Sequence, residues 1–333
     1  MTVHYGLCTY SIGHGPKRAG ILIGEKIWSI SELAGVMPNC GLLDSRAPVL
    51  ALIERWAEVL PALDRLAEFA SNGVNGVAAT GLHDCRVHPP IDLPRQVFCT
   101  GANYRKHVID ITVDTGTGPE GLDREGLYRW AANMMDERAR TGEPYVFTKP
   151  VAAISGAFDP IELPSNTKKP DWELELAVVI GKPGHRIHRD DAFAHIAGYT
   201  IANDISARDL IARQDYKMLG TDWLKSKGQK GFLPLGPSLV PAHLVSNPEN
   251  LKMVLSVNDQ IMQNESSADM IFGIARQIEY ISSYTPLLPG DVICTGSPAG
   301  NGTHYNRFLR EGDVVVGRIE GLGEQRAMCV LAT

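Results

Sequence analysis

The feature that most constrains the fold is an apolar run that carries two glutamates. Residues 171–180 (DWELELAVVI) are dominated by aliphatic and β-branched side chains, and Gly181 ends the run. This pattern is typical of a strand that enters a hydrophobic core. Side chains two residues apart lie on the same face of a strand, so Glu173 and Glu175 project side by side, while the leucines that follow them face the other way.

These two glutamates predict a bound cation. Adjacent carboxylates on a half-buried strand repel each other unless a positive charge lies between them. A third carboxylate, Asp204, closes a second apolar strand at residues 198–203. Three carboxylates without histidine or cysteine favour Mg²⁺ or Mn²⁺ over Zn²⁺. The pattern alone leaves a simpler alternative open, in which Glu173 and Glu175 line a solvated strand face and Asp204 caps a helix.

Composition excludes several classes of protein. The 333 residues are 44% hydrophobic and 21% charged, as in ordinary globular proteins, which rules out a disordered or fibrous chain. With 32 basic and 38 acidic residues the net charge is −6, which argues against nucleic-acid binding. No apolar run approaches the ~20 residues that cross a bilayer, and no signal peptide is visible. The six scattered cysteines predict reduced thiols. We expect a cytoplasmic protein.

The length of the chain and the position of its proline-rich segment predict two domains. We expect residues 1–94 to form a small α+β domain, with two short strands within 19–30 and helical periodicity over 48–70 that Pro61 would kink or split. The proline-rich segment 88–94 would connect this domain to the next.

Residues 95–333 predict a second, strand-rich domain. Short apolar strands recur between Gly, Pro, Asn and Asp turns, and one long helix is expected over 267–284. A long polar stretch at about 108–143, with a helix over 127–140, predicts a lid insertion, because loops of this length in compact domains are usually lids or binding segments.

Seven segments in the same order resemble the fumarylacetoacetate hydrolase (FAH) superfamily over about residues 97–323. They are GANYRKH (101–107), PYVFTKP (144–150), DWELELAVVIG (171–181), GYTIANDISARD (198–209), Lys227 ahead of LGP (235–237), VNDQIMQ (257–263) and LLPGDVICTGSPAG (287–300). The resemblance implies an α+β fold in which an FAH-type mixed β-sheet roll or sandwich follows the small N-terminal α+β domain. It also implies a homodimer.

The resemblance assigns roles to individual residues. It gives the divalent metal to Glu173, Glu175 and Asp204, in agreement with the spacing. It implies His107 as general base, with Asp110 in the place of the glutamate that smaller members carry as its partner. Lys227 completes the predicted catalytic set. Predicted substrate contacts are Tyr104, Arg208, Thr295 and Gly296, although Arg208 equally suits an ion pair with an acidic neighbour. Ile211 stands where the enzyme that names the family has a glutamine.

These residues support carbon–carbon bond hydrolysis. A Mg²⁺ ion, with Mn²⁺ or Ca²⁺ as alternatives, would stabilise an enolate formed from a β-diketo acid, and Lys227 would add positive charge. His107 would take a proton from the attacking water, oriented by Asp110. Expected substrates are acylpyruvates or aromatic ring-cleavage products, which would place the protein in aromatic compound catabolism.

Two other functions stay open at this stage. The same metal–enolate chemistry serves a decarboxylase, hydratase or isomerase of 2-oxo or 2-hydroxydienoic acids, and fold analogy does not choose among them. The non-enzymatic alternative is a binding protein that keeps the metal site but catalyses no reaction. The sequence does not identify the substrate.

Overall fold

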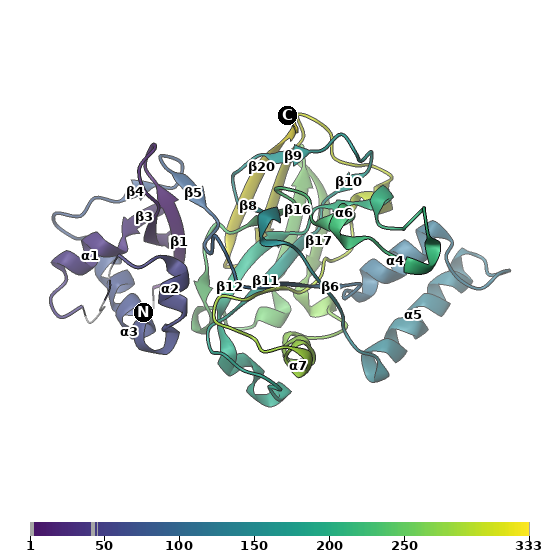
Figure 1. Cartoon of the computed structure of the whole chain (residues 1–333), viewed down its shortest axis with the longest axis horizontal. Helices are drawn as coiled ribbons and strands as arrows, with labels where there is room; N and C mark the ends of the chain where they lie inside the picture. The colour runs from purple at the N-terminus through teal and green to yellow at the C-terminus, as the bar shows by residue number, and fades with distance from the viewer. Residues whose placement is uncertain (1–2, 41–43, 45, 333) are drawn as a thin grey trace.

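A computed structural model describes residues 3–40, 44 and 46–332. The strands gather in a central body, with the N-terminal elements at one end and helices α4 and α5 at the other (Figure 1). The main sheet is mixed, with strand order β7-β6-β18-β11-β12-β14-β8, and β15 also pairs with β12. Its strands are β6 (Val97–Gly101), β7 (Tyr145–Thr148), β8 (Ile154–Gly156), β11 (Leu174–Ile180), β12 (Ile196–Asn203), β14 (Leu233–Leu235), β15 (Val240–Pro241) and β18 (Val292–Cys294).

A second sheet packs against one face of the main sheet. Its order is β17-β16-β19-β20-β9, and the short pair β10–β13 lies apart from it in the pairing scheme. The strands are β9 (Ile161–Leu163), β16 (Lys252–Val257), β17 (Gln260–Ser266), β19 (Val314–Ile319), β20 (Gly323–Leu331), β10 (Pro170–Asp171) and β13 (Ser206–Ala207). The expected strand-rich α+β class with mixed sheets is therefore confirmed.

Strand β11 shows why the two sheets pack together. All seven of its residues are buried. Leu174, Leu176 and Val178 belong to the apolar cluster that also holds β16, β19 and helix α7 (Ile274–Tyr284). Ala177 and Val179 belong to the cluster on the other face. This alternation is the period of two that a strand requires, and it fills both faces of the central sheet.

The N-terminal elements form a separate sheet backed by helices. The sheet has the order β4-β3-β2-β1-β5. The strands are β1 (Gly6–Ser11), β2 (Arg18–Ile23), β3 (Lys26–Ser29), β4 (Thr80–Gly81) and β5 (Arg86–His88), and the helices are α1 (Ile30–Val36), α2 (Val49–Ile53) and α3 (Trp56–Ser71). The strand pair predicted within 19–30 is confirmed by the pairing of β2 with β3.

The predicted helix over 48–70 is split, but not at its proline. The break falls between α2 and α3, where Arg55 has φ −121° and ψ 32°. Pro61 lies inside α3. Because α3 begins only at Trp56, Pro61 falls in its second turn, where its missing N–H leaves one carbonyl of the first turn without the usual partner.

The N-terminal elements share a core with the main sheet. One apolar cluster combines side chains of α1, α2 and α3 with Ala177, Val179 and Val292 of the central strands. Leu7 and Leu239 also exchange two backbone hydrogen bonds of 2.8 Å. The main sheet is therefore held on this side by the N-terminal elements, and the domain boundary at residue 94 stays a prediction.

The segment predicted as a lid consists largely of two packed helices. Helix α4 (Arg105–Thr115) ends at Gly116, whose φ of 65° suits glycine. Helix α5 (Arg124–Thr141) begins at Asp123, whose carboxylate accepts the Gly126 N–H at 2.7 Å. Apolar side chains of the two helices form their own cluster. Sequence periodicity indicated α5 but missed α4, which is largely polar.

Two smaller expectations concern the cysteines and the helix expected over 267–284. All six cysteines are free. Helix α7 begins at Ile274, seven residues after the expected start, because residues 267–269 form a separate 3₁₀ turn. In the described part of the chain, none of the helices combines the length and the apolar character needed to span a bilayer.

A glycine in β12 tests this packing. In Gly198→Ala the new Cβ would lie 2.1 Å from the Val240 carbonyl oxygen of the paired strand β15. We expect the free energy of unfolding to fall by about 1–3 kcal/mol, as for overpacked cores. The control is Gly35→Ala on the exposed side of α1, where nothing lies within 4 Å and alanine favours the helix. Urea denaturation measures both; equal midpoints for Gly198→Ala and wild type would contradict the packing described.

Candidate metal centre

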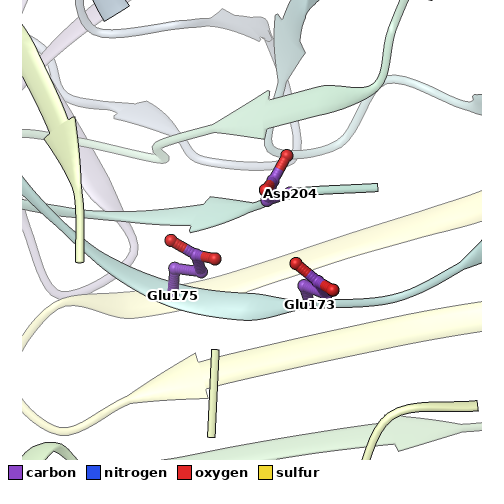
Figure 2. A group of neighbouring side chains, drawn as sticks. All are labelled: Glu173, Glu175 and Asp204. Carbon is purple, nitrogen blue, oxygen red and sulfur yellow. The ribbon is translucent and has the colours of Figure 1, made fainter. Parts of the chain in front are cut away.

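Three carboxylates converge where β11 and β12 meet. Glu173, Glu175 and Asp204 are buried, and one oxygen from each lies within 4.8 Å of the others. Figure 2 shows the two glutamates pointing from one strand toward the aspartate of its neighbour. The antiparallel register pairs Leu174 with Asn203, and the Asp204 N–H donates to the Glu173 carbonyl at 2.8 Å. The strand geometry therefore brings the predicted triad together.

Basic side chains surround this acidic cluster. Lys227, at the end of helix α6 (Trp223–Lys227), donates to Glu173 at 2.7 Å and also to Asp204. Lys149 donates to Asp204 and to the Phe232 carbonyl, the latter at 2.6 Å. Arg208 pairs with Glu173 and with Asp171, its Nε lying 2.8 Å from Asp171 Oδ2. Buried carboxylates persist only when charges of this kind compensate them.

The surroundings of the two glutamates move their pKa values in opposite directions. Burial raises the pKa of Glu173, but Arg208 and Lys227 outweigh it, so the pKa is lowered. Burial and then the Asp204 charge raise the pKa of Glu175 well above its ordinary value. Glu175 accepts a hydrogen bond from the Gly296 N–H at 2.8 Å. Glu175 therefore lies beside the like charge of Asp204, and its hydrogen-bond partner is an uncharged backbone N–H.

This donor set fits a divalent metal. Carboxylate oxygens are the ligands that hard cations such as Mg²⁺, Mn²⁺ and Ca²⁺ prefer. A dication among the three oxygens would relieve the repulsion between Glu175 and Asp204, which the present hydrogen bonds leave in place. Lys227 would remain as a positive neighbour. The predicted metal class therefore agrees with the geometry, without a choice among the three ions.

A cavity of about 220 Å³ opens beside the triad, and His107 of α4 lines it. The His107 side chain is buried, and burial lowers the pKa of its imidazole from 6.5 to about 4, with the charges of Arg208 and Lys227 acting in the same direction against Glu173. Within the described chain no hydrogen bond engages the His107 ring, so a neutral imidazole faces the cavity with its nitrogens available. This position suits a general base.

Asp110 does not complete a dyad with His107 in this structure. The two residues share helix α4, but Asp110 does not line the cavity, and the hydrogen bonds of the described residues include none between them. Burial raises the pKa of Asp110, with His304 and Lys106 opposing. Aspartate is one methylene shorter than the glutamate of the smaller family members, so its carboxylate reaches less far from the helix. The orienting role predicted for Asp110 has no geometric support here.

Three of the predicted substrate contacts also lie outside the cavity. Tyr104 is fully buried in the main core, and its hydroxyl contacts the Met253 sulfur at 3.5 Å. Thr295 donates its hydroxyl to the Leu176 carbonyl at 2.9 Å. Gly296 has φ +100° and directs its N–H at Glu175 rather than at a ligand. Tyr104, Thr295 and Gly296 therefore contact the core or Glu175 instead of the cavity. Arg208 does line the cavity.

Sequence reasoning gave no role to two charged residues of the centre. Lys149 is the penultimate residue of the motif at 144–150, and its position directly after an apolar strand could have indicated a role. Asp171 is fully buried, and it accepts the Gly302 N–H at 2.6 Å from the start of helix α8 (Gly302–Tyr305) as well as Arg208. Its place two residues before Glu173, in the run predicted as one strand, could have indicated it.

Fold and site together define a strand-rich α+β protein with a buried, carboxylate-based metal centre. The family model described as the C-terminal domain of fumarylacetoacetate (FAA) hydrolase matches residues 96–330. The chain belongs to the fumarylacetoacetate hydrolase family, which confirms the resemblance found in the sequence.

Individual relatives have several activities in their names. Human mitochondrial oxaloacetate tautomerase FAHD2B is 37% identical over 236 residues, which are 70% of this chain and 66% of that protein. The fumarylacetoacetate hydrolase structure from Exiguobacterium antarcticum has a TM-score of 0.74 at 26% identity and covers 98% of this chain and 100% of its own. The 2-hydroxyhepta-2,4-diene-1,7-dioate isomerase from Mycobacterium marinum has a TM-score of 0.65 at 27% identity, with 98% of each chain covered.

Removing one acidic ligand tests the metal centre. Glu175→Gln replaces a charged donor with a neutral one, so we expect its affinity for Mg²⁺ or Mn²⁺ to fall by more than the roughly 10–100-fold typical for loss of a group that only supports a ligand. Isothermal titration calorimetry measures the affinity. The matched control is Glu125→Gln on the exposed side of α5, which makes the same change in charge. Unchanged affinity in Glu175→Gln would contradict the assignment.

The buried imidazole predicts a pH-dependent contribution to stability. Between about pH 4 and 6.5 the unfolded chain binds a proton at His107 that the folded chain does not, so stability from this group is complete above 6.5 and is lost as the pH falls. The difference in unfolding free energy between wild type and His107→Gln should therefore vary across this window and stay flat above it. Urea denaturation without added metal measures it; a difference independent of pH would show that the imidazole is not held neutral.

Proposed function

We propose that this chain is a divalent-metal-dependent isomerase that enolises small 2-oxo acids. It would move one proton between carbon 3 of the substrate and the 2-oxo oxygen. The observation that carries this proposal is a neutral, unbonded imidazole in the same small cavity as a buried acidic triad. The names of the tautomerase and isomerase relatives support the reaction class.

The residues of the site would have two separate roles, which are stabilisation of negative charge and transfer of a proton. A divalent ion held by Glu173, Glu175 and Asp204 would supply a Lewis acid for negative charge on the substrate oxygens. Lys227 keeps a positive charge beside the carboxylates, because the charges of Asp204 and Glu173 raise its pKa despite burial. Such a fixed charge in a water-poor cavity stabilises a developing enolate without reorganisation.

His107 would act as the single proton carrier. Its neutral ring accepts the proton from carbon 3 and, as an imidazolium, returns it to the enolate oxygen, so the proton count balances within one residue. This shuttle needs no second carboxylate to hold the ring. It is therefore compatible with the described residues, among which no Asp110–His107 hydrogen bond is found.

Hydrolysis of a carbon–carbon bond is the second candidate. The hydrolase relative supports it, as does a cavity of about 220 Å³ in which His107 could take a proton from water instead of from carbon. A β-diketo acid would then be cleaved between carbons 3 and 4. Both candidates require the same enolate, and they differ in whether water becomes covalently incorporated.

Turnover of two acids tests both candidates. We expect the enzyme with Mg²⁺ to accelerate keto–enol interconversion of 2-oxobutanedioate or 2,4-dioxoheptanoate, and chelation to abolish this. Loss of the base in His107→Ala should lower kcat by roughly 10²–10⁴-fold, whereas His188→Ala, at an exposed position, serves as the matched control. Rates follow from ultraviolet absorbance.

Proton NMR of the 2,4-dioxoheptanoate reaction distinguishes the candidates. Formation of pyruvate and butanoate would identify the reaction as hydrolysis and would contradict isomerisation. Full activity in His107→Ala would overturn both, because each assigns the proton transfer to that imidazole.

A further inference from the structure

The side chains that line the cavity have few donors to offer a ligand. Its two basic residues are already paired: Arg208 with Asp171 and Glu173, and Lys227 with Glu173 and Asp204. In the described part of the chain no further lysine or arginine lines it. In the proposed function a metal ion held by the triad would receive the carboxylate and 2-oxo end of a substrate, which leaves the other end to the rest of the cavity.

The hydroxyl groups of the lining are also engaged within the protein. Thr100 donates to the Gln277 side chain at 2.7 Å, and Thr112 donates to the Val108 carbonyl at 2.7 Å. Ser297 accepts from Gln263 at 3.1 Å and donates to the Pro298 carbonyl at 3.3 Å. A charged group on the substrate tail would therefore lose its water without gaining a free donor from these side chains.

Apart from the acidic triad and the neutral ring of His107, the rest of the described lining is apolar. Val108 and Ile111 of α4 contribute, together with Ile211, and Phe147 stacks on Trp223 with ring centroids 4.7 Å apart. The indole N–H of Trp223 is already given to the Tyr145 hydroxyl at 2.9 Å. Ile211 is held in place by its carbonyl, which accepts the Asp222 N–H at 2.7 Å. This wall suits an alkyl or aryl group.

We propose that the cavity selects 2-oxo acids with an apolar tail over those with a second carboxylate, and that Ile211 is a residue that sets this choice. The inference rests on the proposed function for the orientation of the substrate, with its 2-oxo acid end at the metal centre. It departs from the dicarboxylic acid in the name of the human relative. An apolar tail gains by burial against Ile211 and the aromatic pair, whereas a carboxylate there finds no unpaired lysine or arginine in the described lining.

Binding of two matched acids tests the selection independently of carbon–carbon bond cleavage. 2-Oxoheptanoate and 2-oxoheptanedioate differ by a terminal methyl group against a carboxylate, and neither has the 4-oxo group that cleavage needs. Calorimetry with the Mg²⁺-loaded protein should give a Kd at least about tenfold lower for 2-oxoheptanoate, the lower end of what one group in an apolar pocket discriminates. Equal or tighter binding of the diacid to the wild-type protein would overturn the inference.

A charge placed in the wall tests the role of Ile211. Ile211→Arg should remove or reverse the preference, because it supplies the missing cation. Leu224→Arg is the control: Leu224 is 72% exposed and does not line the cavity, so this variant should keep the wild-type ratio. If both variants changed the ratio alike, Ile211 would have no special role. The protein could prefer 2-oxoheptanoate over 2-oxoheptanedioate and yet turn over no 2-oxo acid. That result would contradict the proposed isomerase activity but would still support the selectivity of the cavity.

Discussion

Everything in this site depends on three carboxylates being held together away from water. Transferring an ionised carboxylate from water into a protein interior costs several kcal/mol, and placing a second beside it adds repulsion. The chain offsets this with Lys149, Lys227 and Arg208, each in contact with a member of the triad. Glu175 is the exception, because a backbone N–H is its partner and its pKa is raised. That imbalance is what a dication would remove.

The fold supplies the rigidity that such a cluster needs. The triad stands at the ends of two central strands whose faces are covered by the second sheet on one side and by apolar residues shared with the N-terminal helices on the other. The proposed base lies on a different element. His107 projects from α4, which packs mainly against α5 at the edge of the molecule (Figure 1). The triad therefore stands on central strands, whereas part of the cavity lining beside it comes from helix α4, which packs on α5.

Sequence patterns predicted the features that follow from short-range rules. The period of two placed Glu173 and Glu175 on one face, and the apolar strands around them gave the fold class. The failures depend on tertiary contacts. Helix α4 is too polar for its periodicity to show, and Tyr104 turns into the core because a buried sulfur and apolar neighbours receive it. Lys149 is distant in sequence from Asp204, so no local spacing could reveal their contact.

Anomalous diffraction from crystals grown with Mn²⁺ tests the metal centre most directly. We expect a single strong anomalous peak among the oxygens of Glu173, Glu175 and Asp204, with Lys227 remaining beside them as a positive neighbour. A map with no peak there at saturating Mn²⁺ would mean that this cluster is a purely structural network of ion pairs.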